Sequence, residues 1–374
     1  MSNQNTRIVF TGDIAFSRYF SDGWKDGGCL DESVLQYLGH AEHIVANVEC
    51  PLTLSEIESA RPLNHAADPR AGAFLARNGI TVWCLANNHI LDCEPKGLLD
   101  TLRCAEENNC VAIGAGKDEK QAAKPVILGE GVKVGVISIA KDWPHVVIRN
   151  GNPGAFTMDR KSLLAKVIAE LRKTVDWVVI MAHNGDEYCS LALPYIRERY
   201  LSFLEMGADI VIGHHPHVVQ QYETVGKKLI AYSLGNFIFD TEHQRRFEHT
   251  DTGMLLGINF GKDSFTFDGF PTCVNREKHI VEKGTIPAIF QNVPEEEYQK
   301  LWPLSARTWY PLHLKNHKTL SKRKIYRYKF LVSLLNIYLC KKKDYRIFQT
   351  GRVRSLLGEW KKSSLQDVVK YLKS

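Results

Sequence analysis

The 374-residue sequence lacks several features that would assign it to a specialised class of protein. Its nine cysteines include no Cys-x-x-Cys pair, and their odd number argues against a disulfide framework. No apolar run reaches the roughly 18 residues that a membrane-spanning helix needs. The first residues contain no charged segment followed by an apolar run, so we expect no signal peptide. These absences predict a globular protein of the reducing cytoplasm, with nine free thiols.

Charge is distributed unevenly along the chain. Residues 301–374 contain 18 lysines and arginines against three acidic residues, whereas the remaining chain contains 30 against 39. Such an asymmetry predicts two regions with different roles. Because the composition changes sign near residue 293, we expect a body at residues 1–293 and a basic, mainly helical region at residues 294–374.

The basic region has two interpretations. An apolar run, Phe330–Cys340, lies between the basic clusters Ser321–Lys324 and Lys341–Lys343, and it is too short to cross a bilayer. In one interpretation it packs on the body as an amphipathic helix whose lysines are solvated. In the other it lies on the anionic inner face of the membrane, where each basic residue contributes about 1 kcal/mol. Nucleic acid is the least favoured partner.

The body alternates short apolar runs with helical patterns. The apolar runs predict strands at Arg7–Phe10, His43–Ala46, Thr81–Leu85, Val134–Ala140, Trp177–Met181 and Asp209–Ile212. Helical spacing predicts helices at about Lys96–Asn108, Leu163–Leu171 and Leu193–Met206. Strand-rich stretches follow at Leu229–Phe239, Met254–Phe260 and Phe265–Val274. This order predicts a layered α/β domain whose second half is more antiparallel.

Side chains that can bind metals follow five of the predicted strands. They are Asp13, Glu49, Asn88, His89, His183, His215 and His217. Each residue alone is more often part of a turn or a core, but the carboxyl ends of strands in open α/β sheets are where ligands bind. Residues 215 and 217 alternate, so in an extended chain their two imidazoles point the same way. Mixed oxygen and nitrogen donors favour Mn, Fe or Zn.

Seven blocks of the sequence carry a family resemblance, and they occur in that family's order. The blocks are TGDIAF (11–16), NVECPLT (47–53), LANNHILDCEPKGLLDTL (85–102), GAGKDEKQAAKPVI (114–127), AHNGDEY (182–188), EMGADIVIGHHPHVVQQYE (205–223) and AYSLGNFIFD (231–240). They resemble the CapA, or poly-γ-glutamate capsule synthesis, family of bacteria. That family is related to the calcineurin-like metallophosphoesterases, so the resemblance implies a four-layered αββα sandwich with mixed sheets and a two-metal centre.

The resemblance also implies a role for each residue of the cluster. Asp13 and His217 would bind the first metal, Glu49 would bridge the two, and Asn88, His183 and His215 would bind the second. His89 would face the substrate phosphate, where it would either donate a proton to the leaving oxygen or hydrogen-bond the developing charge. The wider superfamily has a histidine where this chain has Ala15, so the resemblance leaves open whether one ion binds or two.

The function that the resemblance implies is a metal-dependent phosphoesterase, in which a metal-activated water hydrolyses a phosphate ester. Its substrate would be a phosphorylated small-molecule or polymer precursor of capsule, exopolysaccharide or poly-γ-glutamate. We expect substrate contacts from Asn47, Lys141, His214, Arg245 and Arg246. The alternative is a non-catalytic accessory protein of surface-polymer synthesis, which binds an anionic polymer or a synthase complex.

Overall fold

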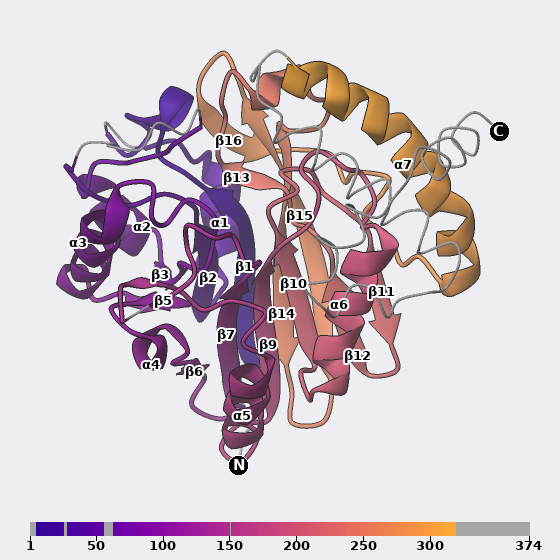
Figure 1. Cartoon of the computed structure of the whole chain (residues 1–374), viewed down its shortest axis with the longest axis horizontal. Coiled ribbons are helices and arrows are strands. Elements are labelled where there is room, and N and C mark those ends of the chain that lie inside the picture. Colours follow the sequence, from indigo (N-terminus) through magenta and orange to yellow (C-terminus); the bar gives the residue numbers. More distant parts are fainter. Residues whose placement is uncertain (1–4, 26–27, 56–62, 150, 319–374) are drawn as a thin grey trace, which may run out of the picture.

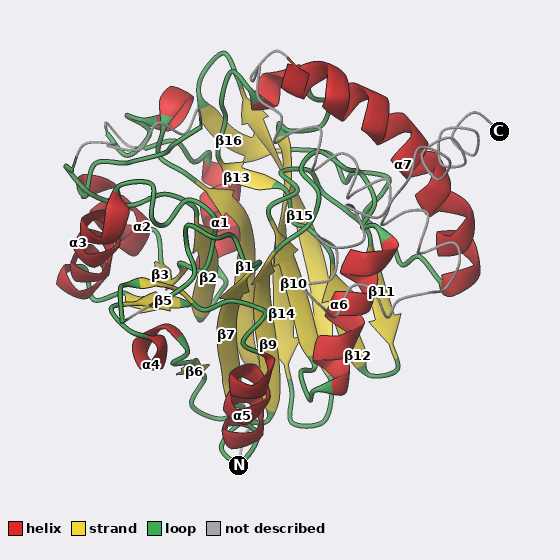
Figure 2. Cartoon of the chain, viewed as in Figure 1, coloured by secondary structure: helices red, strands yellow, loops and turns green. Residues whose placement is uncertain are grey.

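The computed structural model describes residues 5–25, 28–55, 63–149 and 151–318. Two mixed β-sheets pack face to face, and helices cover the outer face of each sheet (Figures 1 and 2). The predicted fold class, an αββα sandwich, is therefore confirmed. Among the described residues, no helix combines the length and the apolar character that crossing a membrane requires.

The first sheet contains eight strands in the order β16-β15-β14-β1-β2-β3-β4, with β13 paired to β1. Their bounds are β1 (Thr6–Ile14), β2 (His43–Val48), β3 (Ile80–Cys84), β4 (Val111–Ile113), β13 (Asn236–Ile238), β14 (Thr252–Phe260), β15 (Phe265–Asn275) and β16 (Ile280–Lys283). Strands β1 to β4 and β13 run parallel, whereas β14, β15 and β16 pair antiparallel. The antiparallel half is the one that the strand-rich stretches predict.

The second sheet contains six strands in the order β11-β12-β10-β9-β7-β6. Their bounds are β6 (Val126–Leu128), β7 (Val134–Ala140), β9 (Trp177–His183), β10 (Ile210–His214), β11 (Tyr222–Val225) and β12 (Lys228–Ala231). The four central strands are parallel and buried on both faces, which explains their nearly continuous apolar sequences. A separate pair is formed by β5 (Ala115–Gly116) and β8 (Gly154–Ala155).

Helices flank the two sheets on opposite sides (Figure 1). On the first sheet lie α1 (Glu32–Gly39), α2 (Arg70–Arg77) and α3 (Glu94–Glu107), and on the second lie α5 (Lys161–Leu171) and α6 (Pro194–Glu205). Shorter turns are α4 (Glu119–Ala122) and the 3-10 helices η1 (Arg18–Phe20) and η2 (Gln244–Arg246). The α6 helix begins at a proline and is followed by Gly207, whose φ of +114° suits a residue without Cβ.

The strand predicted at Leu229–Phe239 is wrong as a single element. Its first part is β12 of the second sheet, and its last part is β13 of the first sheet. The chain crosses between the sheets around Gly235, which has a φ of +67° and where a Cβ would lie 2.7 Å from the carbonyl oxygen of Thr252. The crossing matters because it places Asn236 in register with Asp13.

Helix α7 (Glu295–Lys318) packs on the loop at residues 186–193 (Figure 1). Tyr298 Oη donates a hydrogen bond to the carbonyl of Ala192 at 2.9 Å, and Trp309 Nε1 donates to that of Glu187 at 2.7 Å. The beginning of the basic region therefore contacts the body. The apolar run 330–340 and its flanking basic clusters lie outside the described residues, so the domain boundary and the membrane contact stay predictions.

The cysteines of the described residues are all free thiols. There are eight of them, and seven are buried. Burial raises the pKa of Cys50 and of Cys84 to about 12, so these thiols are unreactive in the folded protein. Cys340 lies outside the described residues, and the predicted count of nine free thiols stays a prediction.

Candidate metal centre

The structure brings the six predicted ligands together where strands of both sheets end. Asp13 lies near the end of β1, Glu49 directly follows β2, and His183 is the last residue of β9. The other ligands come from the loops that follow β3 and β10: Asn88, His215 and His217. We call these six residues the metal centre. The strands reach further than predicted, so that Asp13 and Asn47 lie within β1 and β2.

Two groups of ligand atoms share one carboxylate. Atoms of Asp13, Glu49 and His183 lie within 4.8 Å of one another, and so do atoms of Glu49, His215 and His217. Glu49 Oε1 is 3.4 Å from His183 Nε2 and 3.7 Å from His217 Nε2. A carboxylate that belongs to two ligand groups has the position of a bridging ligand.

The Asp13 carboxylate is fully buried and is held by three donors. Its Oδ1 accepts hydrogen bonds from Asn47 Nδ2 and His214 Nδ1, each at 2.8 Å, and its Oδ2 accepts one from the His215 amide at 3.2 Å. Burial alone would raise the pKa of Asp13, but the bonds from His214 and His217 outweigh it and hold the pKa well below its usual range. Asp13 is therefore ionised, as a metal ligand would have to be.

The Glu49 carboxyl has the opposite electrostatics, although it is equally buried. Burial and the negative charge of Asp13 raise the pKa of Glu49 well above its usual range. Asn47 Nδ2 donates to its Oε2 at 3.2 Å, but Oε1 has no hydrogen-bond partner among the described residues. Of these two buried carboxyl groups, Asp13 is ionised and Glu49 favours its protonated form. A bound cation would stabilise the ionised form of both.

The histidines of the centre are held neutral or paired with Asp13. Burial lowers the pKa of His215 to about 3, and burial is also the main cause that keeps the pKa of His183 well below its usual range. Burial also opposes protonation of His217, but its bond to Asp13 prevails and raises its pKa. Neutral imidazoles expose the lone pair that a metal needs.

The chemistry of the centre fits a divalent transition metal. Several of the buried polar atoms that lack a hydrogen-bond partner among the described residues lie in or beside the centre, namely Glu49 Oε1, His215 Nδ1 and the adjoining His214 Nε2. Buried polar atoms nearly always have a partner. His183 Nε2 donates a hydrogen bond to Asn88 Oδ1 at 2.7 Å, so two of the predicted ligands are in direct contact.

The backbone that carries two of these ligands is strained. His215 has a φ of +95° and His217 a φ of +58°. Residues other than glycine seldom adopt such values, and the strain is found mostly where a site requires it. The two imidazoles therefore do not come from the extended strand that their spacing predicted, but from a turn after β10.

His89 is positioned beside the centre by a buried acid. Its Nδ1 donates to Asp92 Oδ2 at 2.7 Å, and the side chain of Asp92 is 1% exposed. The same oxygen accepts the backbone N–H of His65 at 2.7 Å, and the His65 ring lies edge-on to the His89 ring at 4.5 Å. Because Asp92 fixes Nδ1 as the donor, Nε2 of His89 is left for a substrate.

The residues predicted to bind substrate occupy different environments. Asn47 and His214 are buried, and both donate hydrogen bonds to Asp13, so they orient its carboxylate. The Lys141 amide donates to the His183 carbonyl at 3.0 Å, and its exposed side chain lies near the ring of Trp143. The remaining two, Arg245 and Arg246, belong to η2. Substrate contact by all five stays a prediction.

Sequence reasoning missed several residues that surround the centre. One is Asn236, whose Oδ1 accepts from His217 Nδ1 at 3.0 Å. His65 bonds through Nδ1 to Ser17 Oγ at 2.8 Å. Asn236 stands in the conspicuous block 231–240, which signalled it, whereas nothing in the sequence around His65 suggests a role.

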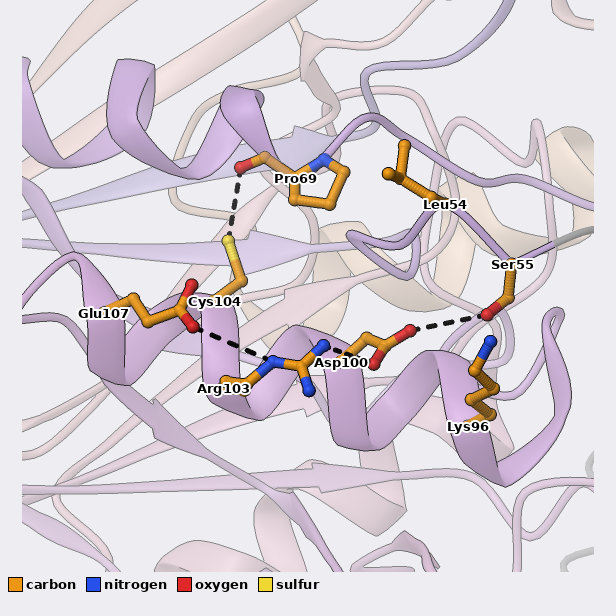
Figure 3. Close-up of a pocket in the computed structure, with 8 residues that line it drawn as sticks. All are labelled: Leu54, Ser55, Pro69, Lys96, Asp100, Arg103, Cys104 and Glu107. Atoms are coloured by element: carbon orange, nitrogen blue, oxygen red, sulfur yellow. Dashed lines mark hydrogen bonds and ion pairs between the residues drawn. The ribbon is translucent and has the colours of Figure 1, made fainter.

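A pocket of about 340 Å³ lies away from these residues, along α3 (Figure 3). Lys96, Asp100 and Arg103 line it, and Arg103 pairs with Asp100 at 2.8 Å. None of the predicted site residues borders this pocket, so the chemistry is assigned to the metal centre.

Comparison with known proteins gives similarities over most of the body. The chain is 28% identical over 249 residues to the capsule biosynthesis protein CapA of Bacillus anthracis, covering 64% of this chain and 61% of that protein. It is 29% identical over 242 residues to the PGA biosynthesis protein CapA of Bacillus subtilis (strain 168), covering 62% of each. The chain thus matches less than two thirds of the length of these relatives. Among solved structures, a 5'-nucleotidase from Candida albicans SC5314 aligns with a TM-score of 0.43 and 10% identity, covering 82% of this chain and 59% of that chain.

The family model described as bacterial capsule synthesis protein PGA_cap matches residues 7–241. This match contains all seven sequence blocks and every ligand of the metal centre. Because it spans more than half of the chain, the resemblance predicted from the sequence is confirmed: the chain belongs to the PGA_cap, or CapA, family of bacterial capsule synthesis proteins.

Proposed function

We propose that this protein is a metal-dependent phosphoesterase that acts on a phosphorylated precursor in the synthesis of capsule, exopolysaccharide or poly-γ-glutamate. The observation that carries the proposal is the pair of ligand groups that share Glu49. The unpartnered atoms Glu49 Oε1 and His215 Nδ1 support it, because they offer donors that a divalent transition metal prefers. The same proposal covers the metal, which would be Mn, Fe or Zn, and the number of ions, which would be one or two.

The residues of the centre would prepare it for an anionic substrate. A divalent metal bound there supplies a Lewis acid that lowers the pKa of water and neutralises phosphoryl oxygens. Asn47 holds Asp13 and Glu49 in one orientation through a single amide nitrogen. His214 and His217 keep Asp13 ionised, and the hydrogen bonds from His214 and the His215 amide hold its carboxylate in one orientation before substrate binds.

His89 would supply the proton for the leaving group. The bond from Nδ1 to Asp92 fixes the orientation of the ring and makes Nδ1 the donor of that pair. A protonated His89 can then donate its Nε2 proton to the leaving oxygen as the ester bond breaks. Such a general acid typically contributes about 10²- to 10⁴-fold to the rate.

The place of the reaction in surface-polymer synthesis is supported by family membership and by the names of the two CapA relatives. Capsule, exopolysaccharide and poly-γ-glutamate precursors are the substrate class that we propose on that basis.

The proposal is tested by metal analysis and turnover on one preparation. We expect purified protein to retain a transition metal and, with added Mn²⁺, to hydrolyse a phosphate mono- or diester from a panel of aryl phosphates, phosphorylated sugars, nucleotides and nucleotide-sugars. Asp13→Ala and His215→Ala should lose both metal and turnover. Arg103→Ala, on α3 and away from the centre, is the matched control and should lose neither.

Two results would contradict the proposal in different ways. If Asp13→Ala and His215→Ala keep the full metal content, the centre does not bind the metal. If wild-type protein binds metal but hydrolyses nothing on the panel, the catalytic assignment is wrong, and the non-catalytic accessory role predicted as the alternative takes its place.

A further inference from the structure

Two arginines follow neighbouring strands at the edge of the sheet where the metal centre lies. Strands β1 and β13 pair in parallel, with Asp13 opposite Asn236. The first runs into η1, which begins at Arg18, and the second runs into η2, which contains Arg245. Because parallel strands end at the same edge of a sheet, both short helices lie beyond the edge that carries Asp13.

Arg245 is held in place by its neighbours. Its Nε donates to Oδ2 of Asp240 at 2.7 Å, and Asp240 is 1% exposed. Its guanidinium carbon lies 3.5 Å from the centre of the Tyr19 ring, a close cation–π contact. Arg276 approaches the same carboxylate at 3.4 Å. The positive charge of Arg245 is therefore largely paired with groups of the protein itself. Because Tyr19 belongs to η1 and Arg245 to η2, their contact connects the two short helices.

Arg18 differs from Arg245 in every one of these respects. It is exposed, and its guanidinium has no hydrogen bond or ion pair with any residue that the structure describes. Its φ is +55°, a left-handed value that disfavours a side chain. His215, His217 and Tyr188 at the centre also have positive φ. Strain of this kind persists where surrounding structure imposes it, and it is concentrated at functional sites.

A chain of contacts connects Arg18 to His89, the proposed general acid. Ser17, the preceding residue, bonds to His65, and the His65 ring lies against His89. Burial is the main cause that lowers the pKa of His65, and the positive charge of Arg18 adds to it. Arg18 directly follows Ser17, the partner of His65, and it lies outside the ligand groups.

We propose that Arg18 binds a second anionic group of the substrate, a carboxylate or a phosphate separate from the ester that is hydrolysed. This inference rests on the proposed phosphoesterase function, in which the metal centre holds the reacting phosphate. A cation beyond the centre then has another part of the substrate to bind. The planar guanidinium presents paired N–H donors that match a carboxylate or phosphate.

The test measures binding, so that it does not depend on turnover. The probes are phosphoserine peptides that continue with four glutamates, with four glutamines, or with a second phosphoserine, and titration calorimetry gives their affinities for Mn²⁺-loaded protein. The peptides place the second charge at several distances from the first phosphate. Hydrolysis of p-nitrophenyl phosphate, which carries no second anion, is measured separately and decides the proposed function alone.

The variants are chosen for the backbone of residue 18. Arg18→Gly removes the side chain and adopts a φ of +55° without strain, so its melting temperature should not fall. Arg18→Lys keeps the charge without the planar donors, and Arg18→Gln is the neutral replacement if the glycine variant does not fold. Arg103→Ala removes an exposed arginine of α3 and is the matched control.

We expect wild-type protein to bind a peptide with a second anion about tenfold more tightly than the glutamine peptide, since hydrogen bonds to charged groups contribute on this scale. Arg18→Gly should abolish the preference, Arg18→Lys should keep part of it, and Arg103→Ala should keep all of it. Raising the salt concentration should weaken the preference in wild-type protein and to the same degree in Arg103→Ala, and should leave Arg18→Gly unchanged. The glutamate and second-phosphoserine peptides distinguish a carboxylate from a phosphate. The inference is overturned if wild-type protein shows no preference or if Arg18→Gly retains it.

Discussion

Replacing Glu49 with glutamine should remove metal binding while the metal-free fold is kept. Glu49 is common to both ligand groups, and its Oε1 lacks a hydrogen-bond partner among the described residues. Glutamine has nearly the same shape, but its neutral amide is a much poorer ligand for a divalent cation. Burial and the charge of Asp13 raise the pKa of Glu49 and favour its protonated form. A neutral amide at position 49 should therefore lower the free energy of unfolding of the metal-free protein only slightly, if at all.

The magnitude follows from linkage between binding and folding. Metal at 100 times its dissociation constant stabilises the folded state by about 2.7 kcal/mol. For a domain of this size that corresponds to a rise of roughly 5 °C in melting temperature. Glu49→Gln should show no rise, and its metal-free melting temperature should equal or exceed that of wild-type protein. Scanning calorimetry of EDTA-treated protein, with and without MnCl₂, measures both quantities.

Two further variants make this result specific. Glu107→Gln changes an exposed carboxylate of α3 and should keep the full rise. Asp13→Asn should instead lower the metal-free melting temperature, because Asp13 is ionised and accepts bonds from His214 and the His215 amide, each contributing about 1.5–3 kcal/mol. The reasoning is refuted if Glu49→Gln retains the wild-type rise with MnCl₂.

Three other predictions follow from residues around the centre and from the thiols. His89→Asn should keep the bound metal and lower kcat by about 10²- to 10⁴-fold; loss of metal would make His89 a ligand instead. Burial, followed by the hydrogen bond with Asp159, raises the pKa of Asp142 to about 6. Folding therefore takes up a proton between about pH 4 and 6. The contribution of Asp142 to the free energy of unfolding falls as pH rises through that range. Asp142→Asn should therefore stabilise the protein more at pH 7 than at pH 4.5 in denaturant titrations, and equal effects at the two pH values would contradict the shift. Thiol labelling of denatured, unreduced protein should count all nine cysteines, and a count of seven or fewer would reveal a disulfide.

The parts of the fold that the sequence predicts best are those with the strongest hydrophobic signal. The buried run Val134–Ala140 is β7 at the predicted bounds, and His183 follows the predicted run Trp177–Met181 as the last residue of β9. A strand buried on both faces leaves few alternatives, and a polar residue at its end is then conspicuous. For this reason the strand-end cluster that contains the six candidate ligands can be predicted from the sequence, and their grouping in space agrees with it.

Other features depend on long-range pairing, which the sequence does not encode locally. Residues 229–239 read as one strand because β12 and β13 are both apolar, and only the glycine at 235 hints at the crossing between sheets. His65 reaches His89 through Asp92, which no spacing rule links to it. Arg245 donates a hydrogen bond to Asp240, and the Arg-Arg pair in the sequence gives no sign of this contact.

The contact between α7 and the loop at residues 186–193 connects the start of the predicted region 294–374 to the body at residues 1–293. Tyr298, Trp302 and Trp309 share one apolar cluster with Leu191, and the same loop carries Tyr188, whose ring stacks near His217 at 6.0 Å. Amide hydrogens of α7 and of this loop should therefore exchange as one cooperative unit. A protease cut at residue 293 would uncover that cluster and loosen one wall of the metal centre, so the shortest chain that keeps the centre intact extends past Trp309.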